Sequence, residues 1–499
     1  MKQIIKRYLL STILCLSCIS IWACSSDKET PDEEEPVVKT LTVDVNKIDL
    51  TNEASSADVI VATNSTGWSV SASDAAWIKF TPVTGVSGRT TVTITALANT
   101  SSATRTAEIT ISSSDVASVK ITVSQAGKTG LYPNYNTSPI AADATGMSST
   151  AVQLAAKMKL GWNIGNTLEA TGSETAWGNP KVTKALIDLV KANGFNAIRI
   201  PCAWNQYANA TTAQINATWL ARVKEVVQYC VDNDMYVIVN IHWDGGWLEK
   251  NVNEAKKEEN NAKQKAFWEQ IATHLRGFDE HLLFASANEP DVKDAAEMAV
   301  LKSYHQTFID AVRSTGGKNA YRNLIVQGPS TDIEKTNQLM TSLPTDSAAN
   351  RMMAEVHFYP YQFTLMTEDA DWGKMFYYWG AGNHSATDPS RNATWGEEAD
   401  VDKFFLMMKT QFVDKGIPVI LGEFGAIRRS NLTGDALTLH LKSRADFYKY
   451  VVKQSKANGL VPFYWDAGNL GVNTMSLFDR SNNTIFDLQA LTALQDGLK

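Results

Sequence analysis

The sequence predicts an α/β protein in which a small all-β, immunoglobulin-like sandwich precedes a (β/α)8 barrel, the TIM barrel. Over residues 141–499, eight short apolar runs alternate with amphipathic stretches, which is the pattern of repeated strand–helix units. Over residues 37–127, short runs alternate apolar and polar residues with a period of two, which is typical of half-buried antiparallel strands. Polar residues also follow several of the later apolar runs, where a barrel carries its functional groups.

The composition bounds the class of protein and its partners. Of 499 residues, 44% are apolar and 20% are charged, and a chain of this length exceeds one ordinary core, so we expect two or three domains. The formal net charge of -7 argues against nucleic acid as a partner, because nucleic-acid-binding proteins carry a basic surface. We therefore expect a neutral substrate rather than an anionic one. Beyond the N-terminal segment only Cys202 and Cys230 remain, and we expect both to be buried hydrophobic residues rather than part of a disulfide framework.

The N-terminus predicts a targeting segment that lies outside the fold. Residues 1–23 combine Lys2, Lys6 and Arg7 with a following apolar run, which is the architecture of a signal peptide. The run ends at Cys24 in a pattern that resembles a bacterial lipobox, although Trp22 stands where a small residue is expected. We therefore expect a lipidated Cys24, an acidic tether over residues 24–36 and a place in the outer membrane at the cell surface. Ordinary secretion with cleavage near Ala23 is the alternative.

Residues 37–127 carry the sandwich pattern, and residues 128–140 are expected to be a linker because the stretch from Gly127 to Pro139 contains two prolines and two glycines. Gly67-Trp68-Ser69-Val70, Ala76-Trp77 and the terminal Ser124-Gln125-Ala126-Gly127 resemble a BACON domain. Trp68 and Trp77 stand where sandwich cores place tryptophan, so no aromatic platform for sugar is evident. We favour a spacer, and a carbohydrate-binding role stays open.

The last region supplies the strands and helices of the barrel. Helical patterns separate the apolar runs, and several end in Asn or Gly directly before the next run, a helix C-cap signal. The expected strands are residues 158–164, 197–200, 236–241, 282–287, 324–327, 352–356, 418–421 and 461–464, and the expected helices are residues 182–193, 219–233, 262–278, 300–315, 401–415 and 439–458.

The residues at the strand ends predict the chemistry. Glu289 ends the fourth expected strand and Glu423 the seventh, so the two carboxylates face each other across the mouth of the barrel. Cleavage of a glycosidic bond needs such a pair, one acid for the leaving oxygen and one carboxylate for the anomeric carbon. The other polar and aromatic residues at these ends are Arg199, His242, Asn288, His357, Tyr359 and Trp465.

These residues, with Asn288-Glu289-Pro290, Gly422-Glu423-Phe424-Gly425 and the stretch Leu160 to Glu169, resemble glycoside hydrolase family 5, and the last stretch is similar to its subfamily 4. The resemblance covers about Thr145 to Lys499 and implies a retaining endo-β-1,4-glucanase that acts on β-glucan or xyloglucan. It implies that Glu289 is the acid/base and Glu423 the nucleophile, with carboxyls about 5–5.5 Å apart. Asn288 would bind the substrate 2-hydroxyl, Arg199 and Tyr359 would support Glu423, and His242, His357 and Trp465 would line the central subsite.

We expect no cofactor and no metal, because the histidines and glutamates lack a metal-ligand spacing such as HExxH. We also expect a monomer whose only membrane attachment is the lipid at Cys24. The aromatic-rich loop from Tyr359 to Thr394 is expected to form a substrate wall rather than core. Two alternatives stay open, namely the same machinery acting on another β-glycan such as mannan, and a non-catalytic glycan-binding surface lipoprotein.

Overall fold

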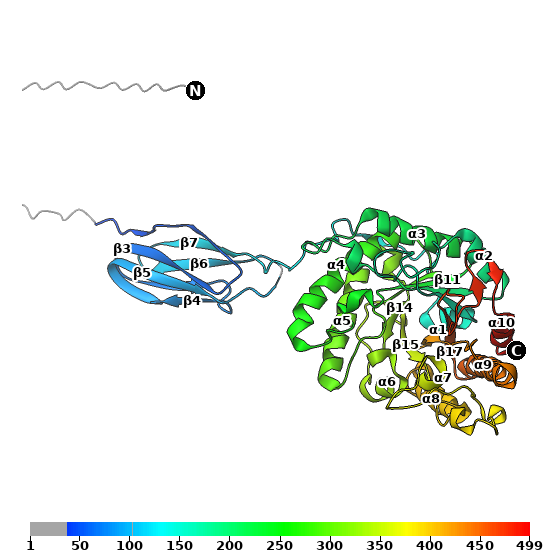
Figure 1. Cartoon of the computed structure of the whole chain (residues 1–499). Helices are drawn as coiled ribbons and strands as arrows, with labels where there is room; N and C mark the ends of the chain where they lie inside the picture. Colours follow the sequence, from blue (N-terminus) through cyan, green and yellow to red (C-terminus); the bar gives the residue numbers. More distant parts are fainter. Residues whose placement is uncertain (1–36, 102) are drawn as a thin grey trace, which may run out of the picture. The chain divides into compact units, whose positions relative to one another are not determined.

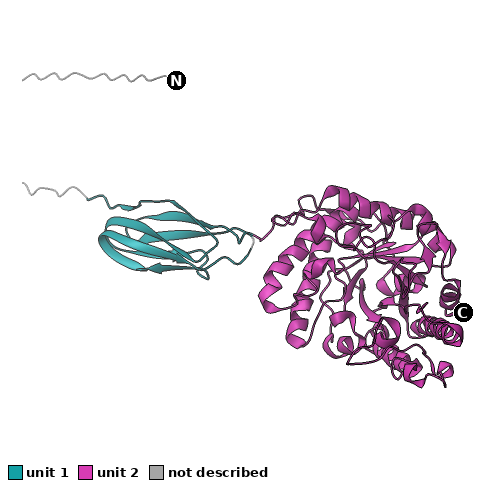
Figure 2. Ribbon diagram, in the orientation of Figure 1, with its two compact units in different colours: residues 1–129 teal, residues 130–499 magenta. Residues whose placement is uncertain are grey.

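The computed structural model describes residues 37–101 and 103–499, and the chain divides into two compact units, Met1–Thr129 and Gly130–Lys499 (Figure 2). The signal peptide, Cys24 and the acidic tether lie outside the described residues. Among the described residues, no helix has the length and apolar character needed to cross a membrane.

The described part of the first unit is a seven-stranded sheet folded around its own core (Figure 1). The strand order is β2-β7-β6-β3-β5-β4, and β1 pairs with β3. Trp68 and Trp77 are each 4% exposed within the core, so neither indole is available for stacking on a sugar. The strands are β1 Leu41–Val43, β2 Lys47–Leu50, β3 Ser55–Ala72, β4 Ile78–Thr81, β5 Thr84–Ala96, β6 Arg105–Ser113 and β7 Val116–Gln125.

The second unit contains a closed barrel of eight parallel strands, in the order β10-β11-β12-β14-β15-β16-β17-β9. The predicted fold class is therefore confirmed. The strands are β9 Gly161–Ile164, β10 Ala197–Ile200, β11 Tyr236–Asn240, β12 Leu282–Ala285, β14 Leu324–Gln327, β15 Met352–Phe358, β16 Val419–Phe424 and β17 Leu460–Asp466.

Helices surround the barrel (Figure 1). Several begin at side chains that accept the free backbone N–H groups of the first turn, such as Asn216, Asp294 and Asp332. Two short strand pairs, β8 Ile140–Ala142 with β13 Gly316–Gly317 and β18 Phe478–Asp479 with β19 Thr484–Ile485, lie outside the barrel sheet. The helices are α1 Ala151–Lys157, α2 Lys184–Ala192, α3 Ala217–Val231, α4 Lys257–Leu275, α5 Ala295–Ser314, α6 Ile333–Leu339, α7 Tyr361–Thr364, α8 Glu398–Gln411, α9 Gly434–Ala457 and α10 Leu488–Asp496.

Part of the segment expected to be a linker packs on the barrel. Tyr132 and Tyr135 contact the core between the strands and helices. The Tyr135 backbone N–H donates to Glu269 Oε2 at 2.9 Å, and its hydroxyl donates to the carbonyl of Thr212 at 2.7 Å. Composition indicated flexibility here, but the two half-buried aromatic rings fix this stretch to the barrel surface.

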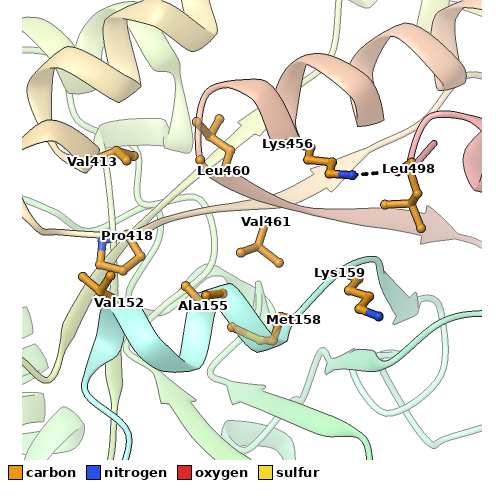
Figure 3. Close-up of a pocket in the computed structure, with 12 residues that line it drawn as sticks. Val152, Ala155, Met158, Lys159, Val413, Pro418, Lys456, Leu460, Val461 and Leu498 are labelled. Carbon is orange, nitrogen blue, oxygen red and sulfur yellow. Dashed lines mark hydrogen bonds between the residues drawn. The ribbon is translucent and has the colours of Figure 1, made fainter.

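The N-terminal end of the barrel holds a cavity of about 670 Å³ (Figure 3). Aliphatic side chains from α1, from the residues before β16 and from the start of β17 dominate its lining, together with Lys159 and Lys456. Lys456 donates to the carbonyl of Leu498 at 2.8 Å. No carboxylate lines this cavity, so it is not a candidate for acid-assisted hydrolysis.

Candidate active site

The interior of the barrel changes from apolar to polar along the strands. Ala197, Ile238, Ile325 and Met353 belong to an apolar cluster that α1 closes from below. Because side chains two residues apart on a strand point to the same face, the next inward positions form a second layer nearer the C-terminal mouth. That layer is polar, and its residues are Arg199, Asn240, Gln327 and Glu355, joined by Asn163 from β9 and Glu423 from β16.

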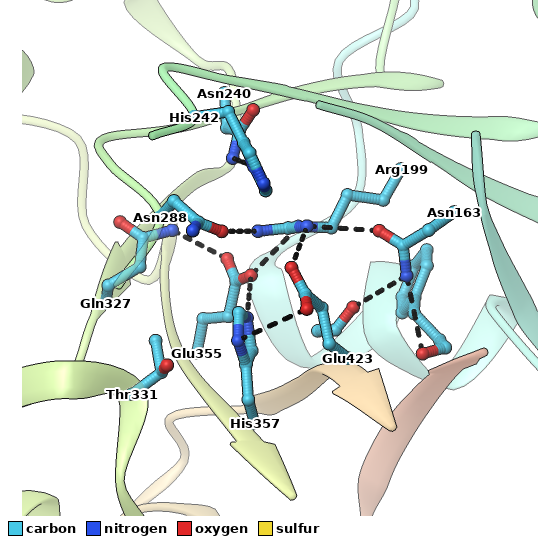
Figure 4. Close-up of polar contacts among 12 residues, drawn as sticks. Asn163, Arg199, Asn240, His242, Asn288, Gln327, Thr331, Glu355, His357 and Glu423 are labelled. Carbon is cyan, nitrogen blue, oxygen red and sulfur yellow. Dashed lines mark hydrogen bonds and ion pairs between the residues drawn. The ribbon is translucent and has the colours of Figure 1, made fainter. Parts of the chain in front are cut away.

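Arg199 is the centre of this polar layer (Figure 4). Its guanidinium is fully buried, and Nη1 donates to Asn163 Oδ1 at 3.0 Å and to Glu423 Oε1 at 2.9 Å. Nη2 donates to Asn288 Oδ1 at 2.8 Å, and Nε lies 3.0 Å from Glu355 Oε1. One permanently charged side chain therefore orients residues of four other strands or strand ends, as the planar donor set of arginine allows.

Glu355 neutralises this cation from below. Its carboxylate is fully buried and lies 3.2 Å from His357 Nε2, while Gln327 Nε2 donates to its Oε2 at 2.6 Å. Gly422 passes directly beside it, since a Cβ atom at this glycine would lie 2.1 Å from Glu355 Oε1. A side chain at position 422 would therefore displace the buried carboxylate or β16.

The two candidate carboxylates meet at the mouth. Glu289, His357 and Glu423 each offer an atom within 4.8 Å of the others. The Glu423 carboxylate accepts from Arg199 at one oxygen and from the Tyr359 hydroxyl at the other, at 3.1 Å, and its side chain is 9% exposed. Glu289 is more open, with a side chain 43% exposed, and its Oε1 lies 2.8 Å from His357 Nδ1.

His357 is protonated near neutral pH. Burial opposes its charge, but the charge of Glu423 and the hydrogen bonds to Glu289 and Glu355 raise the pKa of His357 to about 9. Burial also acts against the charge of Glu289, but the hydrogen bond and positive charge of His357 outweigh it and lower the pKa of Glu289. Burial, reinforced by the charge of Glu289, raises the pKa of Glu423. The pKa values of the three groups therefore depend on one another, and the groups titrate as a coupled set.

His242 and Trp465 form one wall of the mouth. Their rings stack with centroids 5.7 Å apart and planes at 13°. Burial, followed by the charges of Arg199 and His357, holds the pKa of His242 well below its usual value, so this ring is neutral. Asn240 Nδ2 lies 3.2 Å from His242 Nδ1 and orients the imidazole. The wall thus presents a flat apolar face beside neutral hydrogen-bonding groups.

The structure brings the predicted site residues into one cluster except for the lipidation residue Cys24, which lies outside the described residues. Sequence reasoning missed Glu355, Asn163, Gln327, Asn240 and Glu249. A signal existed for Glu355, since an isolated carboxylate two residues before His357 on an apolar strand must share its face. For Glu249, in a loop with no strand pattern, no such signal existed.

The expected aromatic wall between Tyr359 and Thr394 is only partly present. Trp372 is 65% exposed, but four other aromatic residues of this loop pack inside the protein. Phe363 and Trp379 pack edge-on against Phe447 of α9, and Phe363, Phe376 and Trp379 belong to the hydrophobic core of the barrel unit. The buried ones are Phe363, Phe376, Tyr378 and Trp379, while other exposed tryptophans of the barrel loops are Trp177, Trp243 and Trp395.

The cluster of Glu289, His357 and Glu423 also has the composition of a metal site. Its electrostatics oppose one, because both ring nitrogens of the protonated His357 face carboxylates and offer no free lone pair. Arg199 already supplies a fixed positive charge to Glu423. The donor set therefore fits a proton better than a divalent cation.

Comparison with known proteins adds family relationships to this geometry. Residues 163–471 match the family model described as Cellulase (glycosyl hydrolase family 5), and residues 66–126 match BACON, described as a putative N-terminal binding domain. The chain is 40% identical over 456 residues to a xyloglucan-specific endo-β-1,4-glucanase of Bacteroides ovatus, with 86% of each protein covered. It is 36% identical over 397 residues to endoglucanase A of Paenibacillus barcinonensis, with 74% of this chain and 95% of the relative covered.

Solved structures give the same picture. A family 5 xyloglucanase of Bacteroides ovatus in complex with an XXXG heptasaccharide superposes with a TM-score of 0.68 at 36% identity, covering 92% of this chain and all of the other. A broad-specificity endoglucanase of Clostridium cellulovorans superposes with a TM-score of 0.60 at 31% identity, covering 73% of this chain and 99% of the other.

Proposed function

Since this chain belongs to glycoside hydrolase family 5, we propose that it cleaves β-1,4-glucan backbones of the xyloglucan type by a retaining double displacement. It is a glycoside hydrolase of the endoglucanase and xyloglucanase group. The observation that carries the mechanism is the pair Glu289 and Glu423 with atoms within 4.8 Å of each other. This approach is closer to the roughly 5–5.5 Å carboxyl separation of retaining enzymes than to the roughly 6.5–9.5 Å of inverting ones, and it suits direct attack on the sugar.

Glu423 is the proposed nucleophile. Arg199 and Tyr359 donate to its two oxygens, which partly offsets the rise in its pKa caused by burial and by the charge of Glu289 and orients the carboxylate in the mouth. Attack on the anomeric carbon forms a glycosyl ester on Glu423 and breaks the bond to the leaving oxygen. Trp465 gives the sugar in the central subsite an apolar floor, and Asn288, fixed by Arg199, faces its 2-hydroxyl.

Glu289 is the proposed acid/base because it is the more exposed carboxylate and shares a proton with His357. While Glu423 is negatively charged, the proton stays in this group and can be given to the leaving oxygen. Once Glu423 is an ester its charge is gone, and Glu289 is left as a carboxylate that accepts a proton from the attacking water. The ester then breaks and the configuration at the anomeric carbon is retained.

Xyloglucan is the preferred substrate in this proposal. The Bacteroides ovatus relative named xyloglucan-specific is 40% identical to this chain, whereas the broad-specificity neighbour from Clostridium cellulovorans is 31% identical. A mannan-type substrate is the alternative on the same machinery.

The proposal for the N-terminus is separate: lipidation at Cys24 would anchor a monomeric enzyme at the cell surface. Labelling with a radioactive fatty acid, present in the whole chain and absent in Cys24→Ala, tests it.

The experiment for the mechanism compares Glu289→Ala and Glu423→Ala in protein lacking residues 1–24. Both variants should lose at least about 1,000-fold in kcat on xyloglucan, because neither half of the reaction proceeds without its carboxylate. Azide should restore turnover of a dinitrophenyl cellooligosaccharide by Glu289→Ala and release a β-glycosyl azide, since azide needs no general base. Wild-type rates in either folded variant, or an α-azide product, would refute the mechanism.

A further inference from the structure

Glu249 is a buried carboxylate that the proposed reaction does not use. It lies in the loop after β11, beyond the short turn Asp244–Gly246, and the residue is 4% exposed. Acidic side chains are seldom buried to this extent without a role, since removal of a carboxylate from water is costly. Its surroundings therefore show what it supports.

All the hydrogen bonds described for the Glu249 carboxylate are made to two consecutive residues of the candidate site. Its Oε1 accepts the backbone N–H of Glu289 at 2.7 Å and Asn288 Nδ2 at 3.1 Å. The backbone carbonyl of Glu249 accepts the N–H of Asp291 at 2.9 Å. The loop therefore forms hydrogen bonds to the chain on both sides of Pro290. The backbone there lies beyond the end of β12 and makes no β-sheet pairing with β14.

The other oxygen, Oε2, is buried and has no hydrogen-bond partner among the described residues. Burial, followed by the charge of Glu289, raises the pKa of Glu249 to about 7. Lys250 is the neighbouring cation that opposes this rise, and beyond Glu289 lie the cations His357 and Arg199. The charges of Glu249 and Glu289 therefore oppose each other, and ionisation of either carboxylate disfavours ionisation of the other.

From this geometry we propose that Glu249 is a positioning residue, which holds the Asn288–Glu289 segment in place for proton transfer and, when ionised, keeps the shared proton on the acid/base. The inference rests on the proposed role of Glu289. Its first part follows from the two hydrogen bonds to Oε1. Its second part follows from like charge, since a carboxylate beside Glu289 disfavours the loss of a second proton.

The test uses aryl β-cellooligosaccharides whose phenols differ in acidity. A dinitrophenolate leaves without protonation, whereas an unsubstituted phenol needs the acid. In Glu249→Ala, kcat/KM for the phenyl substrate should fall about 100-fold, the cost of displacing a catalytic group by about 1 Å. The dinitrophenyl substrate should lose less than about 5-fold. Glu254→Gln, an exposed carboxylate of the following turn, is the matched control and should leave both rates unchanged.

Glu249→Gln tests the charge separately, because an amide oxygen can still accept the Glu289 N–H. Below pH 6 this variant should keep at least half of the wild-type kcat/KM, and the alkaline limb of its pH profile should move to lower pH. An equal loss on both leaving groups, or an unmoved alkaline limb, would show a purely structural role and overturn the inference. If Glu289→Ala itself showed no dependence on the leaving group, the proposed function would fail instead.

Discussion

The close approach of Gly422 to Glu355 gives a sharp test of how the polar layer is assembled. In Gly422→Ala, the new methyl group would stand 2.1 Å from Glu355 Oε1, 2.7 Å from its Cδ and 2.9 Å from its Cγ. An unstrained contact needs about 3.5 Å, so the carboxylate or β16 must move by more than about 1 Å. Glu355 cannot simply swing away, because Arg199, Gln327 and His357 hold it from three directions.

The expected effect is on catalysis more than on folding. A shift of about 1 Å in Glu355 or in β16 misplaces Arg199 or Glu423, and such a displacement costs about 100-fold in rate. Overpacking of a buried site costs about 1–3 kcal/mol of stability, which leaves the barrel folded. The assay is kcat/KM on a xyloglucan oligosaccharide, together with the thermal midpoint and the far-ultraviolet circular dichroism. Gly277→Ala is the control, since nothing lies within 4 Å of its Cβ position.

A double-mutant cycle identifies the colliding partner. Glu355→Ala removes the obstructing carboxylate, so adding Gly422→Ala to it should cost little further activity, and the two losses should be strongly non-additive. Gly422→Ala with activity within twofold of the wild type would refute the reasoning. So would two additive losses, since additivity would mean that the methyl group disturbs something other than Glu355.

Two further predictions concern protons and metals. Folding raises the pKa of His357 to about 9 and the pKa values of Glu169, Asp244 and Glu249 to about 7. Because each folded value lies above the ordinary one, each group contributes stability below its unfolded pKa. That contribution is lost as the pH rises through the folded pKa. Burial lowers the pKa values of His242, His305 and His440, so these groups act in the opposite sense below pH 7. Between pH 7 and pH 9, where His357 dominates, the free energy of unfolding of residues 130–499 should fall by about 2 kcal/mol, and a denaturant midpoint that rises over this range would contradict it. Dialysis against EDTA should leave kcat within twofold, and a large loss that a divalent cation restores would revive the metal alternative.

The sequence predicted the strands well because the pattern that marks them is local. The expected strands 197–200 and 324–327 coincide with β10 and β14. The misses are instructive: β15 and β16 extend past their apolar runs, to Phe358 and Phe424. The apolar run ends where the barrel interior becomes polar, whereas the strand ends where pairing stops, so hydrophobicity alone marks the wrong boundary.

The candidate site was predicted as a set of residues at strand ends, without its lower layer. Glu289 and Glu423 stand out because each follows an apolar run, and the family resemblance supplied their roles. Glu249 was missed because its loop has no periodicity and its partners are two residues about 40 positions further along the chain. The aromatic loop was misjudged because a high density of aromatic residues does not show whether their rings pack into the barrel core or line an open wall.

By itself the sequence determined the eight strand–helix units and, through the two-residue alternation, which side chains share the interior face. The tertiary structure alone decided which of these meet. Closure of the barrel by β17 and β9 pairs Trp465 with Asn163, and it sets Arg199 beside Glu423, 224 positions away. The coupled titration of Glu289, His357 and Glu423 follows from the same closure, since their pKa values depend on burial and neighbouring charge, and both exist only once the strands have assembled.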